Sequence, residues 1–292
     1  MKIGIVTDST ADISEEIRNK YNIEIVPLSV HFDDKVYRDE IDIDPPTFFN
    51  KLSQAENIPT TSMPPTANFV EKYKEMSAEY DAIISIHLSS ELSGTLQSAQ
   101  MASQEVSDVE IHVIDSCTIS LGLAFYTLMA AKMASKGISI SEILDTIKKA
   151  KENLILYFTV DDLKYIKAGG RIGKARAFLG SILNINPIIT IDSVSGEVMP
   201  LDKQRGKKRT MDKMIEIGKE KLQDAKYAWI GFAHGKREKD MISFKNSLLS
   251  AIKDFNIDYK TFSTQINSTL GCHVGPNVFA GFILTGEFLK DL

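Results

Sequence analysis

Short apolar runs alternate with amphipathic segments through the first half of this 292-residue chain. Residues 3–6 have the length of a buried strand, and Asp12 or Ser14 can cap the helix expected after them. The run at residues 82–88 repeats the pattern and is again followed by a helix-like segment. This alternation predicts a parallel sheet covered by helices on both faces. We therefore expect residues 1–155 to form an α/β domain of α/β/α layers.

The pattern changes after about Asn153. Two β-rich segments, residues 188–191 and 197–199, flank the turn-rich residues 192–196, an arrangement typical of a β-hairpin. Hairpins mixed with helices predict an α+β domain with a mixed or antiparallel sheet over residues 156–292. No long linker separates the two halves, so we expect them to pack closely, with a ligand cleft between them.

Charge and composition exclude several classes of protein. A net charge of −5 argues against a general nucleic-acid binder, which needs a basic face. No run approaches the roughly 20 apolar residues that span a bilayer, and the N-terminal run is too short for a signal peptide. We therefore expect a cytoplasmic protein. Cys117 and Cys272 have no metal-ligand spacing, so we expect reduced thiols, no metal and no cofactor. The same reasoning makes four histidines structural: His31, His87, His112 and His234.

The first of three polar clusters contains Thr61 and Ser62. Pro64 and Pro65 follow, and we expect them to keep this segment out of a regular ladder and to stiffen the loop. The two hydroxyls can face a ligand, or they can cap the helix expected to start near Thr66. The sequence leaves both interpretations open.

The second cluster contains Ser93, Gly94 and Thr95, just beyond a predicted strand. Ligands of open α/β sheets bind outside the carboxyl ends of the strands. The two hydroxyls and the positive end of the next helix can face an anion there, and Gly94 lets the backbone approach closely. A simple helix cap is the alternative. A nucleophilic serine is a third interpretation, although the Gly-x-Ser-x-Gly pattern is absent.

The third cluster surrounds His273, which lies between glycines and a proline and can donate a hydrogen bond. Two glycine-rich segments, residues 169–175 and 231–237, have neither the spacing nor the Ser or Thr of a P-loop, so we do not expect a P-loop phosphotransferase. The basic run at residues 203–209 includes Arg205 and Lys207. It is either a solvated face or a surface that docks an acidic partner or an anionic membrane.

These clusters together resemble the DegV family. The similarity covers residues 6–12, 61–62, 92–99, 169–171 and 273–276, so it extends from one end of the chain to the other. It implies a fatty-acid-binding protein that, in Gram-positive bacteria, serves as the carrier subunit of a fatty acid kinase. In that system a separate ATP-dependent kinase phosphorylates the bound carboxylate, and the acyl phosphate feeds phospholipid synthesis.

The resemblance also implies roles for individual residues. Arg171 matches the arginine of the kinase-facing site. Met63-Pro64-Pro65 departs from the Gln-Pro-Ser that is common in the family, and Asn277 replaces a glycine. These departures leave open the hydrogen bonds of the loop and the turn after His273. The residues expected to hold the carboxylate are Thr61 or Ser62, Ser93 with the backbone of Gly94 and Thr95, and His273.

Physical chemistry is compatible with that function. A carboxylate removed from water needs several donors or a counter-charge, and each buried CH₂ of an acyl chain contributes about 0.8 kcal/mol. We therefore expect an apolar tunnel through the first domain or the interface, and we take Phe125, Met129 and Phe178 as candidates for its lining.

Two other functions remain open. A serine hydrolase or esterase would use Ser93 as nucleophile and His273 as base, and would need the two within hydrogen-bond reach with a carboxylate behind the histidine. A regulatory protein would bind another anionic metabolite at the same residues. The fatty acid carrier, a protein without catalysis of its own, is the leading hypothesis.

Overall fold

A four-stranded parallel sheet forms the centre of the first half. The computed structural model describes residues 1–161, 163–178 and 185–292. The strand order is β2-β1-β6-β7, and the bounds are β1 Ile3–Asp8, β2 Ile23–Val26, β6 Ala82–His87 and β7 Glu110–Asp115. Every residue of β1 and β6 is buried, which explains why these strands read as continuous apolar runs. The predicted parallel sheet is confirmed.

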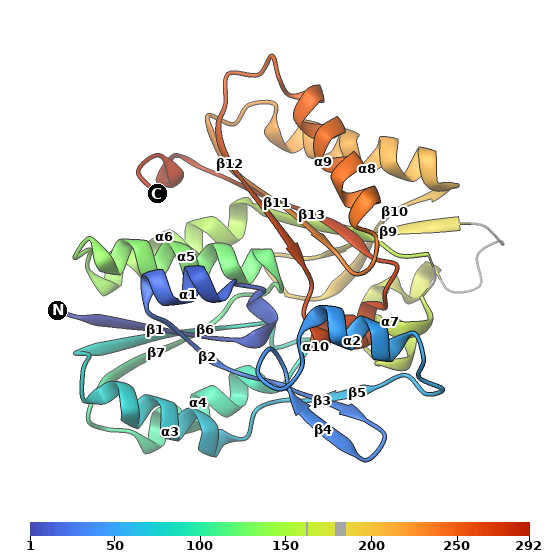
Figure 1. The fold of residues 1–292 in the computed structure, drawn as a ribbon. Coiled ribbons are helices and arrows are strands. Elements are labelled where there is room, and N and C mark those ends of the chain that lie inside the picture. The colour runs from blue at the N-terminus through green and yellow to red at the C-terminus, as the bar shows by residue number, and fades with distance from the viewer. Residues whose placement is uncertain (162, 179–184) are drawn as a thin grey trace.

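Helices cover both faces of this sheet (Figure 1). One face carries α3 (Thr66–Ser77) and α4 (Thr95–Glu105), and the other carries α5 (Leu121–Ser135), flanked by α1 (Glu15–Tyr21) and α6 (Ile140–Asn153). Ser14 caps α1 by accepting a hydrogen bond from Ile17 N. Asp12, the other candidate for this cap, bonds elsewhere, as described below.

The second half is built on a six-stranded mixed sheet in the order β10-β9-β8-β13-β11-β12. Among the described residues of this sheet, β11 and β12 are parallel and the other neighbouring strands are antiparallel. The predicted hairpin joins β9 to β10. The bounds are β8 Leu154–Thr159, β9 Ile185–Ile191, β10 Val198–Arg205, β11 Tyr227–His234, β12 Asp258–Gln265 and β13 Phe279–Thr285. The expected mixed sheet is confirmed.

The two sheets share a layer of helices. In Figure 1, α5 lies between them and contacts β1 and β6 on one side and β11 and β13 on the other. The outer face of the six-stranded sheet is covered by α8 (Lys207–Leu222) and α9 (Glu238–Ala251). The expected close packing follows, because one continuous apolar core includes residues of both halves. The boundary near residue 155 falls at the start of β8, and the division into two domains stays a prediction.

A third, antiparallel sheet in the order β4-β3-β5 flanks the first half. It contains β3 (Ser29–Phe32), β4 (Lys35–Arg38) and β5 (Thr60–Ser62), with α2 (Pro45–Leu52) inserted before β5. The expectation that residues 60–62 stay out of a ladder was wrong, because Thr61 pairs with Val30. Pro64 and Pro65 come after these pairs, so they end the strand without preventing it.

Short helices complete the chain: η1 (Ser9–Ala11), α7 (Lys164–Ala168), η2 (Gly173–Phe178), α10 (Ser268–Val274) and η3 (Glu287–Leu289). Although α10 belongs to the second half of the sequence, it lies beside α2 and β3 of the first half (Figure 1). This placement decides where His273 lies.

Candidate functional site

A cavity of about 130 Å³ is lined by residues of both halves of the chain. Much of its wall is apolar, including Leu28, Leu88, Ile119, Phe158, Ile191 and Leu270. Its polar lining comes from Thr61, Ser93, Arg171, Thr269 and His273, together with Gly94. The structure therefore brings Thr61, Ser93, Gly94 and His273, four of the six residues expected to hold a carboxylate, to one cavity.

The strand β5 separates Thr61 from Ser62. Successive side chains of a strand point to opposite faces. Thr61 Oγ1 lies 2.8 Å from His273 Nε2, whereas Ser62 is exposed, lies outside the cavity lining and bonds His31 Nε2 at 2.9 Å. Neither hydroxyl caps α3, which begins after Pro65 without a side-chain cap. The capping interpretation was thus wrong, and Thr61 is the member of this pair that lines the cavity.

The imidazole of His273 is neutral. Burial, and after it the positive charge of Arg171, lower the pKa of His273 to about 4. Nε2 is engaged with Thr61, and Nδ1 is buried without a partner among the described residues. The ring packs against Gly169, where an added Cβ would lie within 3.0 Å of Nδ1. A neutral imidazole can donate one hydrogen bond and accept another.

Ser93 and the N-terminus of α4 form another part of the polar lining. Ser93 Oγ lies 2.8 Å from Thr95 Oγ1 and accepts a hydrogen bond from Thr95 N at 3.3 Å. Gly94, the N-cap residue of α4, lines the cavity, so the positive end of the helix lies at the cavity wall. Thr95 is fully buried outside the lining, so it supports Ser93 and does not face the cavity.

Arg171 connects the two polar segments. Its Nε donates to Leu92 O at 3.1 Å and its guanidinium donates to Gly169 O at 2.6 Å. Leu92 precedes Ser93, and Gly169 packs on His273, so the arginine holds both segments while remaining exposed at the cavity.

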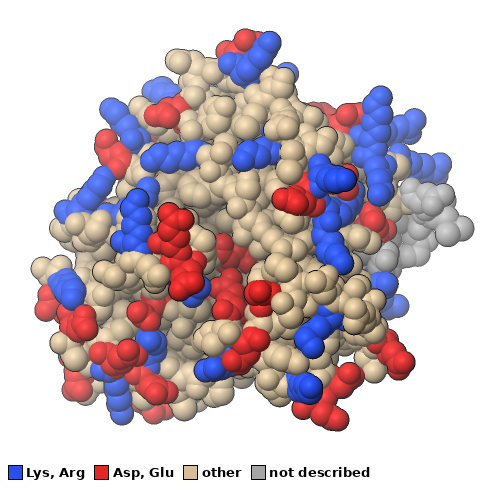
Figure 2. Space-filling model, in the orientation of Figure 1, with Lys and Arg blue, Asp and Glu red and all other residues tan. Residues whose placement is uncertain are grey.

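The other two basic residues expected to contact a partner, Arg205 and Lys207, lie away from the cavity. Arg205 ends β10 and Lys207 begins α8, and both are exposed outside the cavity lining. Figure 2 shows Lys and Arg side chains gathered on the side of the molecule where these two elements meet.

Two buried aspartates hold the start of α10; sequence reasoning missed Asp39 and considered Asp12 only as a helix cap. Asp39 accepts hydrogen bonds from Ser268 N at 3.1 Å and Thr269 N at 3.3 Å. Asp12 accepts one from Asn267 N at 2.8 Å, and it also bonds Ser120. Burial raises the pKa of each carboxyl. These contacts join the first half of the chain to the helix that carries His273.

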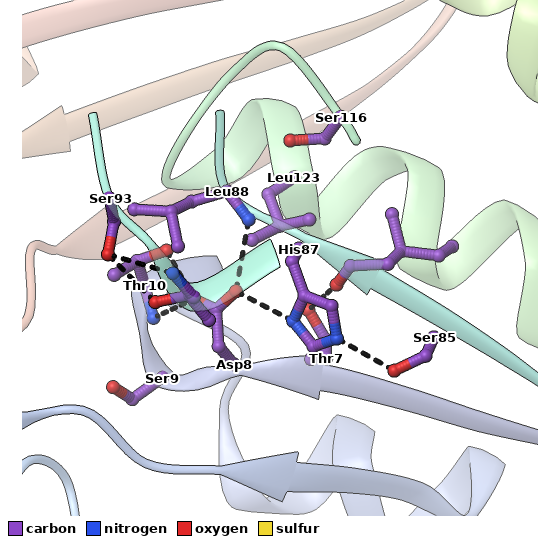
Figure 3. Close-up of polar contacts among 12 residues, drawn as sticks. Thr7, Asp8, Ser9, Thr10, Ser85, His87, Leu88, Ser93, Ser116 and Leu123 are labelled. Atoms are coloured by element: carbon purple, nitrogen blue, oxygen red, sulfur yellow. Dashed lines mark hydrogen bonds and ion pairs between the residues drawn. The ribbon is translucent and has the colours of Figure 1, made fainter. Parts of the chain in front are cut away.

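A separate polar network lies at the carboxyl ends of β1 and β6 (Figure 3). His87 Nδ1 lies 3.1 Å from Asp8 Oδ2, and its Nε2 lies 2.7 Å from Ser85 Oγ, which accepts a hydrogen bond from Tyr73. Asp8 also accepts from Leu88 N at 3.0 Å. The order Ser-His-Asp resembles a hydrolase triad. However, all three side chains are fully buried and outside the cavity lining. The network therefore fixes the end of β6, in agreement with a structural His87.

The hydrolase hypothesis lacks its required geometry at Ser93 and His273. Among the contacts of the described residues, the hydroxyl of Ser93 bonds Thr95 and the imidazole bonds Thr61, with no bond between the two and no carboxylate on Nδ1. The lowered pKa of His273 also makes it a weak general base at neutral pH.

Two of the three candidate tunnel residues, Phe125 and Met129, belong to the packed interior of the protein. Phe125 packs against Trp229 and Phe262 in the layer between the sheets. Met129 is fully buried in α5, and neither residue lines the cavity. The side chain of Phe178 lies outside the described residues.

The described residues contain no group of three His, Cys, Asp or Glu side chains placed to hold a metal ion. Within the same ranges, every helix is too short or too polar to cross a bilayer. Both cysteines are buried and free.

The family model described as "Uncharacterised protein, DegV family" matches residues 2–286. The chain belongs to the DegV family. Protein DegV of Bacillus subtilis (strain 168) is 34% identical over 276 residues, which cover 94% of this chain and 96% of the relative. The family assignment agrees with the resemblance noted in the sequence.

Solved structures of DegV family proteins have the same fold. One from Thermus thermophilus, described as showing fatty acid binding, is 29% identical with a TM-score of 0.92 and covers 98% of this chain and 100% of its own. DegV from Bacillus subtilis, described as a fatty acid binding protein, is 32% identical with a TM-score of 0.89, at the same coverage.

Proposed function

We propose that this DegV protein binds a long-chain fatty acid in the cavity between its halves. The carboxylate contacts Thr61, Ser93, the backbone at Gly94, and His273, and the acyl chain lies among the apolar side chains of the wall. The observation that carries this proposal is one cavity with an apolar wall and a connected set of hydroxyl, imidazole and helix-terminal donors. The fatty acid binding described for the relatives from Thermus thermophilus and Bacillus subtilis supports it.

The electrostatics of the cavity suit a carboxylate. An anion leaving water needs donors and positive charge. Neutral His273 and Ser93 supply donors, α4 supplies a positive helix end, and Arg171 supplies a full charge at the cavity. No bound metal or other cofactor is required for this recognition.

The size of the cavity sets a condition on uptake. A benzene-sized ligand fills a cavity of about 150 Å³, so about 130 Å³ holds only part of a long acyl chain. Apolar side chains of the wall must therefore move apart as the acid enters. Each CH₂ buried contributes about 0.8 kcal/mol, which offsets the cost of that repacking.

The binding test is native mass spectrometry of protein purified from a bacterial host, followed by delipidation and titration with a labelled fatty acid. We expect a copurified fatty acid and reloading of the emptied protein. Ser93→Ala weakens uptake about tenfold, because a donor worth about 1 kcal/mol or more is lost. Ser103→Ala is the control, since its hydroxyl bonds Gln100 O on the same helix, away from the cavity.

An empty protein that takes up no labelled acid contradicts the function, and normal uptake by Ser93→Ala contradicts the assigned site. Recovery of a different anionic metabolite from the purified protein would favour the regulatory alternative.

We further propose that the protein works in the cytoplasm as a carrier without catalysis of its own. It presents the bound carboxylate to a separate ATP-dependent fatty acid kinase, and the acyl phosphate enters phospholipid synthesis. Exposed Arg171 at the cavity and the basic side chains Arg205 and Lys207 support docking of the kinase, and they suit transient contact with an anionic membrane.

This role is tested by acyl phosphate formation with a purified Gram-positive fatty acid kinase. Lys207→Ala lies outside the cavity lining, so it leaves fatty acid binding unchanged and raises the KM for the carrier. Lys219→Ala, at the other end of α8, is the matched control. An unchanged KM for Lys207→Ala would remove this residue from the docking surface, and no reaction with the wild-type carrier would refute the kinase role.

A further inference from the structure

Met63 lines the cavity although the proposed contacts with the carboxylate do not involve it. It follows β5, two residues after Thr61, and 48% of its surface is exposed. A long apolar side chain that lines a cavity and is half exposed contacts solvent on one side and the cavity wall on the other. Met63 is therefore part of the cover between the cavity and the surrounding water.

The thioether of Met63 packs on the N-terminus of α4. A Cβ built on Gly94 would lie within 3.0 Å of Met63 Sδ and 3.4 Å from its Cε, so the sulfur rests directly on the glycine. The side chain thus spans the space between β5, which carries Thr61, and the segment that carries Ser93. The side chain covers the backbone at Gly94, which is proposed to contact the carboxylate. Hydrogen bonds at this backbone are stronger when water is excluded.

We propose that Met63 is a peroxide-sensitive lid whose oxidation lowers the affinity of the protein for fatty acid. This inference rests on the proposed function. A hydroperoxide transfers one oxygen atom to Sδ: the S–O bond forms, the O–O bond breaks, the sulfur loses two electrons and the peroxide leaves as water or an alcohol. Methionine sulfoxide reductase reverses the modification.

The sulfoxide changes the lid in two ways. Its oxygen is polar and requires solvation, so the group no longer packs on Gly94 as an apolar cover. The oxygen is also a hydrogen-bond acceptor beside a site for an anion, where it repels the carboxylate and competes for donors such as Ser93. Both effects act against the bound acid.

The chain offers a matched control in Met101. It lies on α4, the helix that begins beside Met63, and 51% of its surface is exposed. Met101 is not part of the cavity lining. The two methionines are therefore similarly accessible to peroxide, but only one of them touches the site.

The experiment compares the delipidated wild type with Met63→Leu and Met101→Leu. Each is treated with dilute hydrogen peroxide until peptide mass spectrometry shows the remaining exposed methionines converted to sulfoxide, and the Kd for a labelled fatty acid is then measured. We expect the wild type and Met101→Leu to lose about tenfold in affinity, the cost of about 1.4 kcal/mol for one misplaced polar group. Met63→Leu keeps its affinity, and the reductase restores the wild type.

Unchanged affinity of wild type with Met63 fully oxidised overturns the proposal, as does an equal loss in Met63→Leu. A second readout needs no fatty acid. Hydrogen exchange of the backbone amides at residues 94–96 is expected to accelerate after oxidation of wild type and not of Met63→Leu. If the untreated protein binds no fatty acid, the proposed function fails. In that case hydrogen exchange alone tests whether Met63 covers the start of α4, and unchanged exchange after oxidation contradicts that cover.

Discussion

The substitution Gly169→Ala tests whether His273 holds the head group. Gly169 has φ −72° and ψ −8°, a helical conformation that alanine adopts without strain. The added Cβ would lie within 3.0 Å of His273 Nδ1 and 3.2 Å from Cε1. Ordinary carbon contacts are about 3.5–4.0 Å. The ring must therefore shift by about 1 Å. This shift moves it from the position in which Nε2 bonds Thr61.

The magnitude follows from that displacement. Overpacking costs about 1–3 kcal/mol, and loss of glycine from the unfolded chain returns about 0.4–1 kcal/mol. We expect a net destabilisation of about 1–2 kcal/mol, which lowers Tm by a few degrees in a chain of this size. Displacing one donor from the carboxylate costs about 1–3 kcal/mol, so fatty acid affinity falls by about ten- to a hundredfold.

The neighbouring Gly170→Ala is the control. Gly170 has φ +71° and nothing within 4 Å of an added Cβ. Alanine there costs about 1–2 kcal/mol through left-handed backbone strain without touching His273. Thermal unfolding and titration with a fluorescent fatty acid therefore distinguish the two variants. We expect Tm to fall by a similar amount in both, and fatty acid binding to weaken only in Gly169→Ala. Wild-type affinity of Gly169→Ala, or equal weakening in both variants, would refute the role assigned to His273.

Two further predictions concern buried ionisable groups. Asp39→Asn replaces an accepting oxygen with an amide group, which leaves an N–H of α10 unsatisfied at a cost of about 1–3 kcal/mol. We expect urea unfolding to show this loss of stability and titration to show weaker binding of fatty acid. The control is Asp42→Asn, which removes an exposed ion pair worth about 0–1 kcal/mol. Equal stabilities of the Asp39→Asn and Asp42→Asn variants would mean that other contacts hold α10. Because burial and Arg171 lower the pKa of His273 to about 4, the unfolded chain binds more protons than the native protein between about pH 6.5 and pH 4. Unfolding free energy therefore falls by up to about 3 kcal/mol as the pH drops through that window, and His273→Gln removes this part of the slope; identical pH profiles for the two proteins would contradict the buried, neutral imidazole.

The large elements were predicted well from the sequence, because a fully buried strand is a continuous run of apolar residues that can be recognised locally. β1 and β6 are covered on both faces and are continuous apolar runs. The pairing of β4, β3 and β5 into a small sheet was not predicted, because these strands have three or four residues and Val36 of β4 is 60% exposed. So short an alternation carries little signal.

The site was predicted in part, for a related reason. Thr61, Ser93 and His273 were found through motifs, but the choice between Thr61 and Ser62 depended on recognising β5 as a strand. Phe125 and Met129 stay a prediction as tunnel residues, although neither lines the cavity of this structure, because an apolar residue in the wall of a cavity and one packed between two sheets have the same sequence signature.

Asp39 illustrates what local patterns cannot predict. It accepts hydrogen bonds from α10 across 229 residues of sequence, and nothing near it in the chain indicates contact with that distant helix. Burial makes this contact strong, but a contact between residues so far apart in sequence leaves no periodic pattern from which it could be predicted.

The docking of α10 couples recognition to the cohesion of the two halves. His273, Thr269 and Leu270 reach the cavity on this one helix, whose N-terminus is held by Asp39 and Asp12 from the other half. On the proposed function, a bound acid contacts both halves and binds only when α10 is docked. Linkage then requires that a ligand at a hundred times its Kd stabilises the native protein by about 2.7 kcal/mol, and that variants which loosen α10 lose affinity in proportion to the fraction of undocked molecules.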